Sequence, residues 1–234
     1  MPKACLVGDL IVIPALDESV TLPELLARVK AASPRTAMLV VDDGSADGTG
    51  RLAAAAGAEV LRHHRPLGYG RSLLDGIRWA QGHDFERLVT LDADLQHEPE
   101  SIPEFLRVLD HADIAAGSRY HPACRALGRT PAPRRRINRE LTHRLNRLTG
   151  LRRTDVFCGF NGYRTPTLSG LRLDQAGYLF TLQLWVQAAR HRLRIEEVPV
   201  RRIYLRDRRY GSGLDDPAVR RALYLDFLAR ETRR

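Results

Sequence analysis

Residues 87–97 read RLVTLDADLQH, a short apolar run that ends in two aspartates separated by one alanine. The run predicts a buried strand over 87–91, and Asp92 and Asp94 follow it directly. Magnesium and manganese prefer oxygen ligands and are commonly held by one or two carboxylates together with substrate phosphates. The stretch therefore predicts a Mg²⁺ or Mn²⁺ site at Asp92 and Asp94, with Gln96 as a neutral oxygen ligand. In the alternative interpretation, Asp94 only caps the next helix.

The same pattern of short apolar runs and amphipathic stretches continues on both sides of this segment. Up to residue 120 it predicts strands over 10–14, 37–41, 59–63 and 114–117, and helices over 22–32, 46–56, 72–81 and 102–109. Alternation of strands and helices with short connections predicts an α/β fold, in which a mostly parallel sheet is covered by helices on both faces.

The pattern is looser in the second half of the chain. It predicts helices over 137–148, 179–189 and 217–230, a loop with a short extended piece over 157–163, and an extended segment over 195–204. No internal repeat and no low-complexity linker separates the two halves. We therefore predict a single domain over 1–234.

Two other predicted strands also end in acidic residues. Asp17 and Glu18 follow the first strand, and Asp42 and Asp43 follow the second. In parallel α/β sheets, ligands bind outside the carboxyl ends of the strands. Carboxylates at three strand ends therefore predict a ligand that brings a cation with it.

The charge of the chain is strongly positive and is carried almost entirely by arginine. The formal net charge is +9, and residues 119–153 contain eleven arginines and one acid, Glu140. The planar guanidinium suits phosphate groups, so this region favours nucleic acid, an anionic membrane surface or a phosphorylated substrate as a partner. No apolar run approaches the roughly 20 residues of a membrane-spanning helix. Together with the absence of a secretory signal pattern, this predicts a cytoplasmic protein.

Six short motifs in order along the chain identify a resemblance to a known family. They are IPALDE at 13–18, VDDGSADGT at 41–49, LDADLQH at 91–97, GSRY at 117–120, GF at 159–160 with YR at 163–164, and EVPV at 197–200. This set resembles glycosyltransferase family 2, and within it the dolichol-phosphate mannose synthase branch. The resemblance covers about residues 9–214.

The resemblance implies a GT-A fold, which is a Rossmann-like sheet flanked by helices with a C-terminal acceptor-side extension. Residues of about 9–120 would bind the nucleotide-sugar donor, and those of about 121–234 would bind the acceptor. The implied donor-binding residues are Pro14, Leu16, Glu18, Val41 (through its backbone), Asp43 and Ala93, with Arg208, Arg209 and Ser212 closing over the diphosphate. Asp92, Asp94 and Gln96 would hold the metal.

The resemblance also implies an acceptor and a mechanism. Arg119, Arg135 and Arg139 would bind the phosphate of a polyprenyl phosphate acceptor, which arrives ionised and needs no strong general base. Direct displacement on a hexose donor such as GDP-mannose or UDP-glucose would invert the anomeric carbon. Asp155 is the expected additional carboxylate near the acceptor, where it orients the sugar or an arginine. Its alternative role is that of an ordinary loop or helix-cap aspartate.

Other functions are compatible with parts of the pattern. A family 2 enzyme that acts on a hydroxyl acceptor would need a carboxylate base, and Leu16, where the family usually has tyrosine, leaves the donor open. A non-catalytic nucleotide-binding or nucleic-acid-binding protein would explain the charge but not carboxylates at three strand ends. A lipid acceptor would require the protein to lie on the inner face of the membrane as a peripheral protein, for which the arginine-rich 137–148 helix is the candidate.

Overall fold

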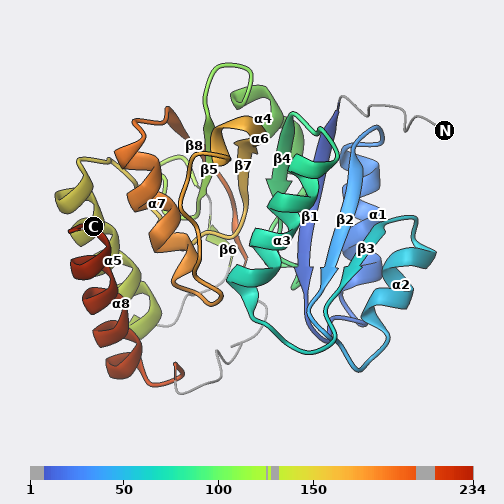
Figure 1. Ribbon diagram of the computed structural model, residues 1–234, viewed down its shortest axis with the longest axis horizontal. Helices are drawn as coiled ribbons and strands as arrows, with labels where there is room; N and C mark the ends of the chain where they lie inside the picture. The colour runs from blue at the N-terminus through green and yellow to red at the C-terminus, as the bar shows by residue number, and fades with distance from the viewer. Residues whose placement is uncertain (1–7, 125, 128–131, 204–213, 234) are drawn as a thin grey trace.

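The fold is centred on one seven-stranded sheet with the strand order β3-β2-β1-β4-β7-β5-β8 (Figure 1). The computed structural model describes residues 8–124, 126–127, 132–203 and 214–233. The strands of this sheet are β1 Asp9–Ala15, β2 Ala37–Asp42, β3 Glu59–Arg62, β4 Arg87–Thr90, β5 Ile114–Ser118, β7 Asn161–Arg164 and β8 Ile195–Pro199. A second, two-stranded parallel sheet pairs β6 Ala126–Leu127 with β9 Arg202–Ile203.

Helices cover both faces of the sheet. One face carries α1 Leu22–Ala32, α2 Thr49–Ala55 and α4 Ile102–Val108, which a short 3₁₀ turn, η1 Pro99–Ser101, precedes. The other face carries α3 Tyr69–Gly82, α5 Ala132–Thr149, α7 Phe180–Arg190 and α8 Pro217–Glu231, and α6 Thr165–Leu168 follows β7. The mostly parallel, doubly covered α/β sheet predicted from the sequence is thus confirmed.

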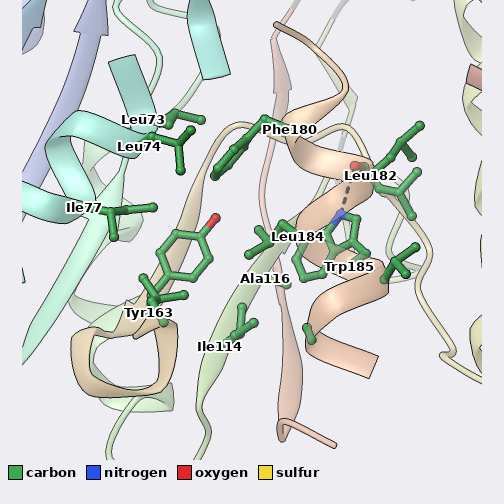
Figure 2. Packing of buried hydrophobic residues seen from close by; sticks show 14 of the residues in the cluster. Leu73, Leu74, Ile77, Ile114, Ala116, Tyr163, Phe180, Leu182, Leu184 and Trp185 are labelled. Atoms are coloured by element: carbon green, nitrogen blue, oxygen red, sulfur yellow. Dashed lines mark hydrogen bonds between the residues drawn. The ribbon is translucent and has the colours of Figure 1, made fainter. Parts of the chain in front are cut away.

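The apolar strands of the sheet serve two cores at once. Successive side chains of a strand point to opposite faces, so Leu10 and Val12 enter one core while Ile11 and Ile13 enter the other. Figure 2 shows the first of these cores, where α3 and α7 pack over the sheet. There the indole nitrogen of Trp185 donates to the carbonyl oxygen of Val156 at 3.0 Å. Continuous apolar strands are what a sheet covered on both faces requires.

The strand β7 differs from the sequence prediction, which gave only a short extended piece in a loop. It lies between β4 and β5 and is antiparallel to both. The side chain of its first residue, Asn161, bonds β5 and the preceding loop: its Oδ1 accepts from the Gly117 amide at 3.2 Å and its Nδ2 donates to the Cys158 carbonyl at 2.7 Å. Because β7 runs against its neighbours, its start lies at the edge where β4 and β5 end. The preceding loop is therefore held at that edge.

The helix α2 begins at Thr49 and not at residue 46 as predicted. The residues before it are tied to the loop that follows β1. Asp17 donates its amide to Ser45 Oγ at 3.0 Å, and its carboxylate accepts from the Ala46 amide at 2.9 Å. Asp17 has a φ of 53°, a left-handed conformation that Asp and Asn adopt more readily than most residues. These contacts hold the loops after β1 and β2 side by side.

Candidate active site

A cavity of about 640 Å³ opens at the carboxyl ends of β1, β2 and β4. After β1 the chain adds strands first on one side (β2 and β3) and then on the other (β4). Ligands of parallel α/β sheets bind at such a point of reversal, and the cavity lies there. The helices α5 and α8 contribute its far wall. The predicted site residues that line it are Pro14, Leu16, Glu18, Asp43, Asp92, Ala93, Asp94, Gln96 and Arg119.

Four other predicted residues lie elsewhere in the described part of the chain. The Val41 side chain is fully buried in the sheet core, and Val41 does not line the cavity. Asp155 is buried behind Arg119, outside the cavity lining. Arg135 and Arg139 are exposed on α5 and do not line the cavity. A further three, Arg208, Arg209 and Ser212, lie outside the described residues.

The loop after β4 presents its carboxylates to the cavity. Asp92 accepts a hydrogen bond from the Tyr69 hydroxyl at 2.9 Å, and its other oxygen lies 3.4 Å from His97 Nε2. Asp94 accepts from the Gln96 amide at 3.1 Å. Leu95 between them has a φ of 59°, so the chain reverses tightly enough to keep residues 92–96 together.

The two carboxylates differ in their electrostatics. Although burial alone would raise it, contacts with His97 and Tyr69 hold the pKa of Asp92 below its ordinary value. Burial and the neighbouring charge of Asp92 together raise the pKa of Asp94. A bound cation would remove this repulsion between the two groups.

Gly159, in the loop before β7, lies in close contact with the Asp92 carboxylate. A Cβ atom at Gly159 would lie 2.3 Å from Asp92 Oδ2, so any other residue at this position would force the Asp92 carboxylate to move. The Gly159-Phe160 pair therefore lets the backbone pass over this carboxylate. Phe160 stacks on Phe105 with the ring centroids 4.1 Å apart, which fixes the loop in the core.

The residues present fit a divalent cation whose remaining coordination positions are filled by phosphate oxygens of the substrate. Asp92, Asp94 and Gln96 supply oxygen atoms of the kind that Mg²⁺ and Mn²⁺ prefer. Within the described residues, no cluster of three or more His, Cys, Asp and Glu side chains could hold a metal by itself. Two carboxylates and one amide leave coordination positions for phosphate oxygens and water, as in sites that bind a metal together with a nucleotide.

At the end of β2, Asp43 is held by a buried histidine. His63 Nδ1 lies 2.7 Å from Asp43 Oδ1, and His63 Nε2 lies 3.2 Å from Asp75 Oδ2. Asp43 also accepts from the amides of Leu67 and Gly68, at 2.8 and 2.9 Å. These contacts fix the orientation of the Asp43 carboxylate at the wall of the cavity.

On the opposite wall, Arg119 is fixed by Asp155. The guanidinium donates from Nε and Nη2 to the two carboxylate oxygens, at 2.7 and 3.1 Å. Asp155 is fully buried and accepts in addition from Asn138 Nδ2 at 2.9 Å and the Phe157 amide at 3.0 Å. Burial opposes ionisation, but Arg119 and these donors lower the pKa of Asp155 to about 2. Asp155 is thus ionised and holds Arg119 at the cavity.

Sequence reasoning missed several lining residues, of which two contact Asp92 and four lie on the far wall. They are Tyr69, His97, Arg134, Asn138, Arg220 and Tyr224. For Arg134 a signal exists in the sequence. It lies three residues before Ile137 and four before Asn138, and both of these are buried, so helical periodicity places Arg134 on the inward side of α5. For Arg220 the sequence offers no such signal, because Arg221 is equally compatible with an amphipathic helix.

A sequence model described as Glycosyl transferase family 2 matches residues 10–171. The chain belongs to this family. The match includes the strand-end carboxylates and Arg119, so this glycosyltransferase carries the family's motifs at the cavity described above. The glycosyltransferase class predicted from the sequence is confirmed.

Two curated relatives are similar over most of their length. One is the undecaprenyl-phosphate mannosyltransferase of Micrococcus luteus, 35% identical over 199 residues that cover 82% of each chain. The other is the polyprenol monophosphomannose synthase of Mycolicibacterium smegmatis, 35% identical over 202 residues that cover 82% of this chain and 76% of the relative. These similarities confirm the predicted branch within family 2.

Solved structures with the same fold include the glucosyl-3-phosphoglycerate synthase of Mycobacterium tuberculosis in complex with Mn²⁺, UDP-glucose and phosphoglyceric acid. The TM-score is 0.76, and the superposition covers 97% of this chain and 80% of that enzyme at 20% sequence identity. At this identity the likeness concerns the fold, and it confirms the GT-A fold expected for this glycosyltransferase.

Proposed function

We propose that this glycosyltransferase transfers a hexose from a nucleotide-diphosphate sugar to a polyprenyl phosphate, with inversion at the anomeric carbon and with a divalent cation. The observation that carries the proposal is the polarity of the cavity. Carboxylates from the ends of β1, β2 and β4 line one side, and arginines from the end of β5, α5 and α8 line the other. A cavity of this kind suits two phosphorylated substrates, of which one carries a metal.

The donor would bind on the carboxylate side. Pro14, Leu16, Glu18 and Asp43 would surround the nucleoside, where the orientation of Asp43 is fixed by His63. Asp92, Asp94 and Gln96 would hold a divalent cation, which when bound stabilises the charge that develops on the leaving nucleotide. The names of the two curated relatives, both polyprenyl-phosphate mannose enzymes, support a mannose donor.

The acceptor would bind on the arginine side. A phosphate monoester is already ionised at neutral pH, so it can attack the anomeric carbon without a general base. Arg119, fixed by Asp155, would orient the phosphate and offset its repulsion by the donor diphosphate. The described carboxylates that line the cavity are Glu18, Asp43, Asp92 and Asp94, all on the donor side. A base for a hydroxyl acceptor is thus missing from the described arginine side, which favours the phosphate acceptor.

An acceptor and donor screen tests this proposal. The purified chain is incubated with GDP-mannose or UDP-glucose, Mg²⁺ or Mn²⁺, and either a short polyprenyl phosphate or the matching alcohol. We expect transfer to the phosphate, none to the alcohol, and loss of activity on addition of a chelator. A rate with the alcohol equal to that with the phosphate would contradict the assignment of the acceptor.

We further propose that α5 brings the enzyme to an anionic membrane surface. None of the helices in the described residues is long and apolar enough to span a bilayer. The exposed side of α5 carries Arg135, Arg136, Arg139, Arg144 and Arg147. Each arginine near an anionic surface contributes about 1 kcal/mol of attraction.

Charge reversal on α5 tests the membrane proposal. The double variant Arg135→Glu with Arg139→Glu is expected to weaken cosedimentation with anionic vesicles by about 30-fold or more, because two attractions of about 1 kcal/mol each are lost. The matched control is Arg35→Glu with Arg51→Glu, two exposed arginines near α1 and α2 at the opposite end of the molecule (Figure 1). Equal weakening by both pairs, or wild-type binding that salt does not reduce, would contradict the role of α5.

A further inference from the structure

The tyrosine that begins α3 bonds one of the carboxylates in the loop after β4. The Tyr69 hydroxyl donates to Asp92 Oδ1 at 2.9 Å, and both residues line the cavity. The other oxygen of Asp92 lies 3.4 Å from His97 Nε2. The two oxygens are thus contacted from different elements, one from α3 and the other from the loop after β4. Together these contacts fix the direction in which the Asp92 carboxylate is turned.

The ring of Tyr69 is itself held by the loop before α7. It stacks on the ring of Tyr178, with the centroids 5.7 Å apart and the planes inclined by 19°. The same loop packs closely on the first turn of α3. A Cβ atom at Gly70 would lie 2.3 Å from the carbonyl oxygen of Gln175, so any other residue at position 70 would force this loop to move. The loop before α7 therefore keeps the Tyr69 hydroxyl at Asp92.

The contact with Tyr69 opposes a repulsion within the metal-binding loop. The charge of Asp92 contributes to the raised pKa of Asp94, so the two carboxylates repel each other when no cation is bound. A hydroxyl group that donates to Asp92 holds it in place without adding a charge to the cavity. Groups that orient a metal ligand in this way typically contribute 10- to 100-fold to metal affinity.

We propose that Tyr69 is a positioning residue of the metal site, and that its hydroxyl holds Asp92 in the orientation that binds the divalent cation. This inference rests on the proposed function, because it takes a divalent cation to bind at Asp92. Tyr69 acts on the cation only through Asp92. Loss of the hydroxyl should therefore weaken metal binding, and a higher metal concentration should restore the activity.

Removal of the hydroxyl alone tests this role. The variant Tyr69→Phe keeps the ring that stacks on Tyr178. Calorimetric titration with Mn²⁺ is carried out at saturating GDP or UDP, whichever nucleotide the donor screen selects. We expect the Kd for Mn²⁺ to rise by about 10- to 100-fold. In steady-state kinetics the Mn²⁺ concentration at half-maximal rate should rise by a similar factor, whereas kcat at saturating Mn²⁺ should stay within about threefold of the wild type.

A tyrosine away from the cavity supplies the matched control. Tyr163 of β7 is 2% exposed and does not line the cavity. The variant Tyr163→Phe loses the same hydroxyl from a buried ring, so it shows any general effect of such a loss on the fold. Its Kd for Mn²⁺ is expected to stay within about twofold of the wild type, as for a substitution that does not touch the metal loop.

The measurements distinguish the positioning role from a structural one. An unchanged Kd for Mn²⁺ in Tyr69→Phe would overturn the inference, as would a loss of rate that saturating Mn²⁺ does not relieve. Equal weakening of Mn²⁺ binding in Tyr163→Phe would overturn it too. If the wild type bound no Mn²⁺ in the presence of nucleotide, the metal-dependent function proposed above would fail as well. The two failures are therefore distinguishable.

Discussion

Replacing Asp94 with alanine is expected to lower the rate of metal-dependent sugar transfer by about a thousandfold or more and to leave the fold intact. Loss of one strong electrostatic contact to a transition state typically costs a hundredfold to a thousandfold in rate, and loss of a bound metal costs at least as much. Asp94 is one of the two carboxylates that face the cavity from the loop after β4. Without it, a cation would keep only Asp92 and Gln96 as protein ligands.

The same substitution should not weaken the protein in the absence of metal. Burial and the charge of Asp92 raise the pKa of Asp94, so the ionised carboxylate destabilises the folded state at neutral pH. The free energy of unfolding of Asp94→Ala is therefore expected to equal or exceed that of the wild type. This separates the loss of activity from a loss of folding.

The measurements are the transfer rate with Mn²⁺ and nucleotide sugar, calorimetric binding of Mn²⁺ with nucleotide, and urea unfolding without metal. Asp110→Ala is the control, since Asp110 is an exposed aspartate that pairs with Arg87 at 2.6 Å and does not line the cavity. It should retain transfer within about twofold of the wild type, as is usual for surface substitutions. Near-normal turnover by Asp94→Ala would refute the metal assignment.

Replacing Asp155 with alanine is expected to lower the free energy of unfolding by about 3–5 kcal/mol, the usual cost of removing one partner of a buried ion pair. The substitution would leave the guanidinium of Arg119 without its carboxylate and would remove the acceptor for Asn138 and the Phe157 amide. The position of Arg119 would then no longer be fixed. We therefore also expect a rise in the KM for the acceptor.

The acid dependence of stability gives a second measure of the same contact. The pKa of Asp155 falls from its ordinary value of 3.8 in the unfolded chain to about 2 in the folded protein. Its contribution to stability is therefore fully present above about pH 4 and is lost as the pH falls towards 2, which amounts to about 2 kcal/mol. Urea unfolding of wild type and Asp155→Asn between about pH 5 and 2 would show a steeper loss for the wild type. Parallel curves for the two proteins would contradict the assigned pairing.

The prediction of the donor half succeeded because its signals are local. Each buried strand is a short β-branched or apolar run, and residues such as Asp43 and Asp92 follow such runs directly. Parallel strands bring all their carboxyl ends to one edge of the sheet. The edge at which the cavity lies could therefore be predicted without knowledge of any tertiary contact. The loops after β1 and β2 obey the same rule, although their hydrogen bonds shifted the start of α2 to Thr49.

The sequence predicted arginines of α5 at the cavity, but at other positions than those the structure shows. Arg135 and Arg139 were expected at the acceptor phosphate, whereas the structure places Arg134 at the cavity and leaves these two exposed. The resemblance implied Arg135 and Arg139 without fixing the rotation of α5, and residues one position apart on a helix face different directions. The position of β7 was missed because an asparagine and a glycine begin it, and neither favours a strand.

The sequence by itself determined the alternating α/β architecture, the family, and the edge of the sheet at which its carboxylates gather. Those features depend on hydrophobic periodicity and on residues that follow a strand directly, both of which are properties of neighbouring positions in the chain. Only the tertiary structure decided three features of the site. Gly159 lies against the Asp92 carboxylate, Asp155 forms an ion pair with Arg119, and Arg220 rather than Arg221 lines the cavity. Each of these depends on how segments far apart in sequence pack, and the rotation of a helix against the sheet is set by that packing and not by its own residues alone.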